Sequence, residues 1–254
     1  MRMHQKYQGA LTFLLSLLFW FLPASDRGIP DAESLIEAMY KKYDGKWYQT
    51  LTFEQQTIRY DTAGNVTKEE LWYEALRMPD KLSIKIQDWD SGNGMMIRND
   101  SLYRFKEGAI TGTRPMLHPL LILGFSVYNQ PVEKTINDLK VLGVDFSKFH
   151  KRTFEGEKVY VVGAEEGDET STQFWVRKNG LLFVRLIQNF GEGRTQDIRF
   201  NKYQPLGGGW IAPEVLFYAN GKLRLKEVYT NIRTPELSKE VFEPGHFQTI
   251  RWKP

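Results

Sequence analysis

The chain has 254 residues, of which 41% are hydrophobic and 26% charged, a balance that is typical of a folded globular protein. Lys and Arg total 34 against 31 Asp and Glu, so the formal net charge of +3 predicts no strongly basic face, and we expect no nucleic-acid partner. The chain has no cysteine, which excludes a disulfide scaffold, a thiolate metal site, a cysteine nucleophile and a cysteine-linked lipid anchor.

Residues 1–25 have the pattern of a secretory signal peptide. A positively charged start precedes an apolar run from Ala10 to Leu22, and small residues follow the run. An uncleaved membrane anchor is the alternative, but the run is shorter than the roughly 20 residues that a spanning helix needs. We predict cleavage after Ala24 or Ser25, export, and a single domain over residues 26–254.

The mature region opens with a helical pattern and continues with strands. Apolar residues recur at helical spacing from Asp31 to Tyr43, and Gly45 follows as a stop signal. After it, runs with strand character are separated by hairpin turns, among which Asn179-Gly180 and Asn220-Gly221 are the strongest signals. No helices alternate with these strands, which argues against a parallel sheet and favours an antiparallel one.

Two segments in the middle of the chain interrupt the strands. Residues 117–125 are apolar on nearly every side, which is typical of a buried helix, and residues 131–142 form an amphipathic helix that ends at Gly143. The predicted fold is therefore mainly β: a curled antiparallel sheet of about eleven strands forms an incomplete β-barrel, with an N-terminal helix and inserted helices as a lid.

Alternation along the first strands predicts which side chains face the interior of the curled sheet. The candidate cavity and lid residues are Phe53, Leu71, Tyr73, Arg77, Leu82, Ile84, Ile86, Leu117, Leu120, Leu121 and Phe125. Arg77 either holds a polar head group or latches the lid at the cavity rim, or it is a solvated arginine at a strand end. The apolar residues of 117–125 either cover a cavity or belong to the ordinary core.

The sequence shows few signals for catalysis or for a cofactor. His118, His150 and His246 are far apart and have no metal-ligand spacing, and no nucleophile elbow or phosphate loop is present. The segment Asp88–Asn93 resembles the start of a calcium loop but lacks the glutamate that such a loop needs, so a polar turn is expected. We expect no catalytic residue, no metal and no cofactor.

The order of these pieces resembles the LolA/LolB-like family of periplasmic lipoprotein carriers. The resemblance runs from about residue 31 to 244 and rests on short motifs: Phe53-x-Gln55 after the first helix, a hairpin at Gly64, Leu71-Trp72-Tyr73, Arg77-Met78-Pro79, the hairpin of residues 96–103, Pro119–Leu123, and Val241-Phe242-Glu243-Pro244. Met78 separates the arginine from the proline, a departure from the family pattern.

The resemblance implies a monomeric, non-enzymatic protein of the periplasm with a hydrophobic cavity that shields acyl chains. The implied partners are lipoproteins, an inner-membrane release complex and an outer-membrane acceptor. Because the chain has no cysteine for lipid attachment, the soluble carrier branch fits better than the anchored acceptor branch. Two alternatives stay open: a lipid- or lipoprotein-sensing regulatory protein on the same fold, and an exported enzyme with an unrecognised carboxylate site.

Overall fold

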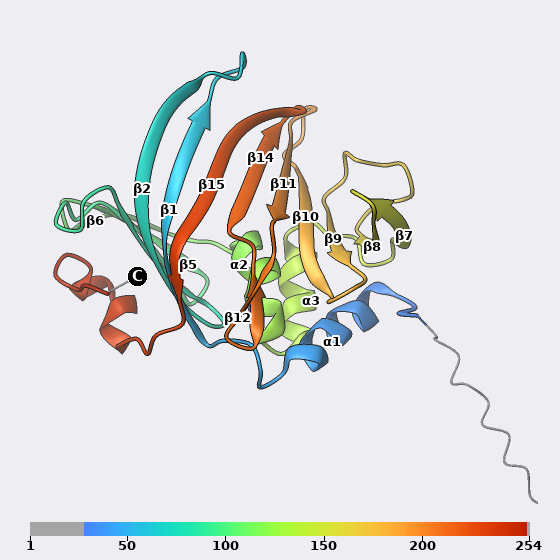
Figure 1. Ribbon diagram of the computed structural model, residues 1–254, viewed down its shortest axis with the longest axis horizontal. Coiled ribbons are helices and arrows are strands. Elements are labelled where there is room, and N and C mark those ends of the chain that lie inside the picture. The colour runs from blue at the N-terminus through green and yellow to red at the C-terminus, as the bar shows by residue number, and fades with distance from the viewer. Residues whose placement is uncertain (1–27, 253–254) are drawn as a thin grey trace, which may run out of the picture.

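The computed structural model describes residues 28–252, so the predicted signal peptide lies outside the described residues. Within this range, one antiparallel sheet of thirteen strands forms most of the molecule (Figure 1). Its strands are β1 (Thr50–Tyr60), β2 (Val66–Arg77), β3 (Lys81–Ile86), β4 (Gly94–Arg98), β5 (Ser101–Lys106), β6 (Ala109–Pro115), β7 (Phe149–Phe154), β8 (Glu157–Val162), β9 (Gln173–Arg177), β10 (Leu182–Asn189), β11 (Thr195–Asn201), β14 (Glu214–Ala219) and β15 (Lys222–Arg233).

The first strand along the chain, β1, pairs with the last one, β15. The strand order is β6-β5-β4-β3-β2-β1-β15-β14-β11-β10-β9-β8-β7, so the β1–β15 pairing joins an N-terminal half, β1–β6, to a C-terminal half. The edge strands β6 and β7 stand at opposite ends of this order, and the sheet is therefore curled but open. The predicted fold class, an incomplete antiparallel barrel with an N-terminal helix and inserted helices, is confirmed.

The strands outnumber the eleven or so that the sequence predicts. The edge strand β6 was missed because it is mostly exposed and has no apolar alternation, which is common for an edge. Two short strands, β12 (Gln204–Leu206) and β13 (Gly209–Ile211), form a separate two-stranded sheet, and a turn at Gly207-Gly208 connects them.

The predicted hairpin turns have the backbone conformations that their residues favour. In the turn between β14 and β15, Asn220 and Gly221 both have positive φ, at 50° and 74°. In the turn between β1 and β2, Asp61 Oδ1 accepts hydrogen bonds from the backbone N–H groups of Ala63 and Asn65 at 2.8 and 2.9 Å.

Helical segments cover the concave face of the sheet (Figure 1). They are α1 (Ala32–Tyr43), α2 (Pro119–Gly124), the 3-10 turn η1 (Ser126–Tyr128) and α3 (Val132–Val141). Asp31 caps α1 by accepting a hydrogen bond from Ser34 N–H at 2.7 Å. The helices predicted at 31–43, 117–125 and 131–142 are confirmed.

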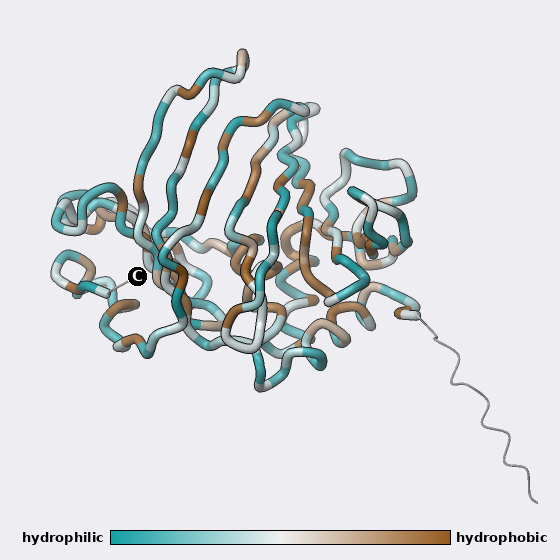
Figure 2. The backbone as a smooth tube through the Cα atoms, in the orientation of Figure 1, coloured by the Kyte–Doolittle hydropathy of each residue, from teal (hydrophilic) through white to brown (hydrophobic). Residues whose placement is uncertain are grey.

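The main hydrophobic core lies between these helices and the concave face. Apolar and polar residues alternate along the long strands, as Figure 2 shows, and the apolar ones on the concave side meet the buried faces of the helices. Aromatic rings join α1 to the helical insertion: Trp47 stacks on Tyr128 with ring centroids 3.9 Å apart, and Tyr43 meets both rings edge-on. This packing fixes the insertion against the N-terminal helix.

The C-terminal segment covers the convex face of the N-terminal half. It contains two 3-10 turns, η2 (Lys239–Phe242) and η3 (Pro244–His246), and packs Phe242 and Trp252 against outward residues of β2. It also buries Lys85 of β3, whose ammonium donates to the carbonyl of Ile250 at 2.8 Å. Alternation along β3 sets Lys85 opposite to the apolar Leu82, Ile84 and Ile86, yet Lys85 is buried because the C-terminal segment covers that face.

Candidate functional site

A cavity of about 250 Å³ lies between the concave face of the sheet and the helical insertion. Most of its walls are apolar. The apolar lining residues are Phe53, Leu76, Leu82, Ile84, Met95, Leu120, Leu121, Phe125, Phe200 and Phe217, and the lining residues with polar groups are Gln55, Trp72, Glu74, His118, Glu227 and Tyr229. An apolar cavity with a few converging polar groups is the usual form of a ligand site.

Six of the predicted cavity and lid residues line this cavity. They are Phe53, Leu82, Ile84, Leu120, Leu121 and Phe125. Two others, Ile86 and Leu117, pack against the main core without lining the cavity. The geometry therefore brings β1, β3 and the insertion together as the sequence predicts, while the ligand-binding role of these residues stays a prediction.

The predicted inward face of β2 is the wrong one. Strand pairing sets Gln55 of β1 opposite Trp72, and Phe53 opposite Glu74, so the even-numbered residues of β2 face the cavity. Tyr73 and Ala75 instead belong to the small core under the C-terminal segment, and Leu71 is 38% exposed. The alternation of apolar and polar residues does not identify the inward face of β2, because both faces of the strand are covered near its C-terminal end.

Arg77 lies on the convex face of β2, together with Tyr73 and Ala75. Its guanidinium donates to the backbone carbonyl of Leu237 and lies over the ring of Phe242, 5.5 Å from the centroid. It anchors the C-terminal segment, and it does not line the cavity. The prediction of an arginine at the cavity rim is therefore wrong, and so is the alternative of a solvated arginine.

The lid segment, defined as residues 117–128, contacts the sheet through two hydroxyls: that of Tyr128, which accepts from Phe183 N–H at 3.1 Å, and that of Ser126. The Ser126 hydroxyl is buried and contacts the carbonyl oxygens of Leu121, at 2.9 Å, and of Pro79 in the turn between β2 and β3. Each hydroxyl has a single proton to donate, so these two acceptors share it. Ser126 therefore joins the lid segment to this turn, whereas Arg77, for which a lid latch was one of the predicted alternatives, does not.

His118 immediately precedes α2 in the lid segment, and its side chain is neutral. Its Nδ1 accepts a hydrogen bond from Leu121 N–H at 3.1 Å and so caps α2. Burial lowers the pKa of His118 to about 4. Because Nδ1 is the acceptor, the proton of the neutral ring is on Nε2.

Two carboxyl groups reach the cavity from β2 and β15. Burial, together with the nearby Glu227, raises the pKa of Glu74 well above its ordinary value. Burial raises the pKa of Glu227 to about 7, against the hydrogen bond that it accepts from the Tyr229 hydroxyl at 2.9 Å and the nearby charge of Arg59. Neither glutamate was predicted from the sequence. A signal was present, because Glu74 lies two residues from Trp72 and Glu227 two residues from Tyr229, and residues two apart in a strand share a face.

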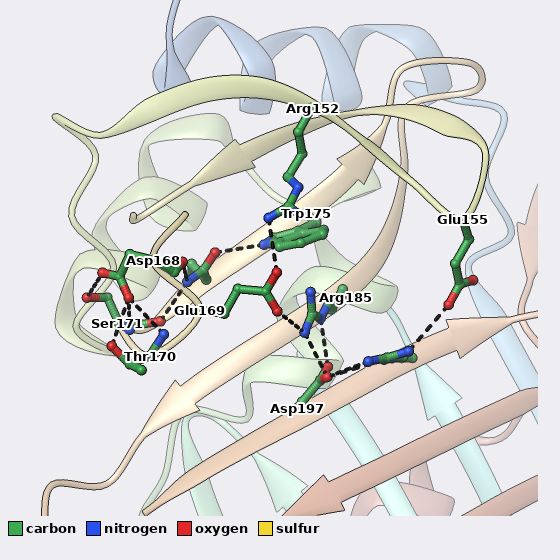
Figure 3. A network of polar contacts seen from close by, with 11 residues as sticks. Arg152, Glu155, Asp168, Glu169, Thr170, Ser171, Trp175, Arg185 and Asp197 are labelled. Carbon is green, nitrogen blue, oxygen red and sulfur yellow. Dashed lines mark hydrogen bonds and ion pairs between the residues drawn. The ribbon is translucent and has the colours of Figure 1, made fainter. Parts of the chain in front are cut away.

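The convex face of the C-terminal half carries a different polar cluster (Figure 3). Arg185 of β10 is 4% exposed, donates twice to Asp197 at 2.8 Å and once to Glu169 at 2.9 Å, and lies 4.2 Å from the ring centroid of Trp175. Asp197 also accepts from Arg199 at 2.9 Å. Every charge at the centre of this cluster has a partner of opposite sign, which indicates a structural role.

Within residues 28–252, no helix is long and apolar enough to cross a membrane. No protein-family model matches the sequence, and no curated protein matches it.

Solved structures share the fold at low sequence identity. A LolA superfamily protein from Nitrosomonas europaea is similar with a TM-score of 0.52 and 11% identity, over 82% of this chain and 96% of that one. A DUF1329 family protein from Desulfovibrio piger has a TM-score of 0.53 and 17% identity, over 83% and 95%. A domain named for outer membrane lipoprotein sorting, from Vibrio parahaemolyticus, has a TM-score of 0.52 and 13% identity, over 85% and 97%.

The architecture defines a class of protein: an open antiparallel half-barrel with a helical insertion over an apolar cavity. The structural likenesses identify the fold as LolA-like: the chain shares it with a LolA superfamily protein and with a domain named for outer membrane lipoprotein sorting.

Proposed function

We propose that the protein is a soluble periplasmic carrier that shields the acyl chains of lipoproteins during their sorting to the outer membrane. The observation that carries this proposal is the apolar cavity enclosed between the concave sheet and the lid segment. Each methylene group that leaves water contributes roughly 0.8 kcal/mol, so such a cavity favours acyl chains without covalent chemistry. The fold that the chain shares with a domain named for lipoprotein sorting supports the same reading.

The proposal requires the lid segment to move. The enclosed volume is about 250 Å³, below the roughly 300–1,000 Å³ of cavities that hold drug-sized ligands. Two or three acyl chains therefore fit only if the lid segment opens and the cavity widens. The shortness of α2 is compatible with such opening, which must break the Ser126 contacts, while Tyr128 at the end of the lid segment is hydrogen-bonded to Phe183 N–H at 3.1 Å and packed on Trp47.

Further parts of the proposal concern the whole chain. Residues 1–25 act as the export signal, and residues 26–254 work as one domain and as a monomer that binds without catalysis. An inner-membrane release complex loads the carrier and an outer-membrane acceptor unloads it. Transfer then follows the acceptor's stronger binding of the same chains.

A loading assay tests the carrier function. The protein is mixed with a detergent-solubilised diacylated lipoprotein, the detergent is removed, and the lipoprotein that stays in solution with the protein is measured. We expect Leu121→Glu to abolish most of this retention, because a carboxylate then faces the acyl chains in the cavity. The matched control is Val141→Glu on α3, where the native side chain is 76% exposed, and it should retain lipoprotein like the wild type.

Equal retention by a folded Leu121→Glu variant contradicts the proposal. Purification from the native envelope separates the carrier from the regulatory alternative. An equimolar lipoprotein supports the carrier, whereas a membrane-spanning regulatory partner without lipoprotein supports the sensor.

A further inference from the structure

Three glutamates point from the concave face of the sheet, and their surroundings differ. Glu70 of β2 forms ion pairs with Lys68 at 2.8 Å and Arg59 at 3.5 Å. Glu227 of β15 accepts a hydrogen bond from Tyr229 at 2.9 Å. Glu74 lies four residues further along β2 than Glu70, and it has no hydrogen-bond or ion-pair partner among residues 28–252. The cavity therefore contains a carboxyl that the protein itself does not satisfy.

Glu74 is 7% exposed, and its cross-strand neighbours are Phe53 and Ile84, both apolar. A polar group buried in such surroundings without a partner is costly, and a buried charge is more costly still. Another buried polar atom lies on the same strand face, since Trp72 Nε1 also has no partner among the described residues. Unsatisfied polar groups that line a cavity are groups that a ligand can satisfy.

The lining residues of the cavity include no Lys or Arg. His118 is neutral, because its Nδ1 accepts a hydrogen bond and burial holds its pKa at about 4. Arg59, whose charge acts on Glu227, pairs with Glu70 at 3.5 Å and does not line the cavity. The polar part of the cavity holds two carboxyls, Glu74 and Glu227, beside the N–H donors of Trp72 and His118 and the Gln55 amide, whose nitrogen donates to Thr57 at 2.8 Å. Two neighbouring carboxyls in a lining without Lys or Arg favour a hydrogen-bond-donating cation as their partner.

We propose that the cavity selects amphiphiles whose apolar chains end next to a primary ammonium group, with Glu74 and Glu227 as the recognising carboxylates. This inference rests on the proposed binding of acyl chains and names the head group that the same site accepts. The chains pack between the lid segment and the phenylalanine side chains of β1 and β14, while the ammonium donates to both carboxylates.

Two sources can provide such an ammonium. One is a lipoprotein whose chains are on the side chain of its first residue and whose α-amino group is free. The other is a lipid with an amine in its head group. A phospholipid also brings a phosphate, which the two carboxylates repel, so we expect the free amino terminus of a lipoprotein to bind more tightly.

The site also predicts how binding depends on pH. The groups that face Glu74 and Glu227 are Arg59 and Gln55 from β1, Glu70 from β2, Tyr229 from β15 and His118 from the lid segment. An ammonium favours the charged carboxylates, so its binding releases protons and weakens as the pH falls below the pKa of Glu227. An uncharged ligand lacks this dependence.

Calorimetry with three amphiphiles of equal chain length tests the inference. The probes are dodecylamine, dodecanol and dodecanoate, measured at pH 8. We expect dodecylamine to bind at least about tenfold more tightly than dodecanol, and dodecanoate to bind most weakly. At pH 5.5 the advantage of dodecylamine should disappear, while the affinity for dodecanol stays the same.

Variants assign the effect to the cavity. Glu74→Gln keeps the shape and removes the charge, and it should remove most of the preference for the amine. Glu69→Gln removes the same charge from the opposite face of the same strand, where Glu69 is exposed, and should leave the preference unchanged. A diacylated lipopeptide with a free α-amino group should bind better than its N-acetylated form and better than phosphatidylethanolamine.

The outcomes separate this inference from the proposed function. If dodecanol binds as tightly as dodecylamine, or if the N-acetylated lipopeptide binds as well as the free one, the ammonium selectivity is wrong and the apolar cavity stands. A tighter phosphatidylethanolamine complex keeps the ammonium site and assigns it to a lipid. If no amphiphile binds at all, the carrier function itself fails.

Discussion

The cluster around Arg185 and the cavity at Glu74 are two buried polar regions of one sheet, and they are built in opposite ways. Arg185 has two carboxylate partners and an aromatic ring against it. Glu74 has apolar neighbours and no partner among the described residues. Burying a charge is costly in both places: partners offset this cost at Arg185, whereas at Glu74 burial raises the pKa of the carboxyl and so disfavours its charged form. The difference separates a buried charge that stabilises the fold from a buried carboxyl that we propose binds a ligand.

The two regions also respond to pH with opposite signs. Although burial opposes it, hydrogen bonds from Arg185 and Arg199 lower the pKa of Asp197, so its stabilisation is present above the ordinary pKa and is lost on acidification. Glu227 has a raised pKa, so the folded protein binds its proton more tightly than the unfolded chain does. The contribution of Glu227 to stability is therefore lost as the pH rises, whereas the contribution of Asp197 is retained at high pH.

The largest expected effect comes from removing the arginine of the cluster. Arg185→Met should lower the free energy of unfolding by about 3 kcal/mol or more, because it leaves Asp197 and Glu169 without their shared partner. Urea unfolding measures the change. In the matched control Arg194→Met, whose exposed side chain pairs with Glu192 at 3.5 Å, we expect a change below about 0.5 kcal/mol. Equal effects would erase the distinction between buried and surface pairs.

The next effect is a difference in pH dependence between the wild type and Glu227→Gln. The pKa of Glu227 is about 7 in the folded protein against an ordinary 4.5, so the wild type loses stability relative to the variant as the pH rises through this window. Between pH 5 and 8 we expect a relative loss of about 2–3 kcal/mol.

Unfolding curves of both proteins, measured across this pH range, give that difference directly. His118 titrates with the opposite sign, because its lowered pKa makes stability rise from about pH 4 to 6.5, but it does so in both proteins and cancels. A constant difference across the range contradicts the raised pKa.

A smaller effect separates the convex face from the cavity. Arg77→Met should lower the free energy of unfolding by about 1–2 kcal/mol, because it removes the hydrogen bond to Leu237 and the contact with Phe242. Dodecylamine binding should stay unchanged, since Arg77 does not line the cavity. A change in binding at constant stability would return Arg77 to the site.

The smallest effect concerns the latch of the lid segment. Ser126→Ala should cost about 1 kcal/mol of stability and speed hydrogen exchange of the amides of α2, because the contacts with Pro79 and Leu121 are lost. Ser147→Ala, which removes an exposed hydroxyl bound to Asp145 at 2.6 Å, should leave exchange in the lid segment unaffected. Unchanged exchange in Ser126→Ala shows that the latch lies elsewhere.

The sequence predicted those features that depend on neighbours in the chain. Periodicity and Asp31 locate α1, the Asn220-Gly221 pair locates a hairpin, and the apolar run at 117–125 locates the lid segment. Each signal lies within a dozen residues of the structure it specifies, which is why it survives without knowledge of the fold.

The prediction of the inward face of β2 was wrong because a segment distant in sequence covers the opposite face of the strand. Residues 234–252 have little periodicity, yet they cover the convex face of β2 and β3, so Tyr73 and Ala75 are apolar on the outside and Lys85 is buried. On the cavity side, Glu74 breaks the expected apolar alternation of β2. A strand with one cavity-facing side that carries a carboxyl and one side covered by a distant segment has no alternation that identifies its inward face.

The pairing of β1 with β15 has a consequence for how the molecule assembles. The middle of the sheet consists of strands from the two ends of the folded region, with Gln55 opposite Tyr229. Such a contact closes a loop of most of the chain, and topologies dominated by distant pairings fold slowly. The sheet wall of the cavity includes Glu227 and Tyr229 of β15, so this wall is complete only when the last strand has paired with the first.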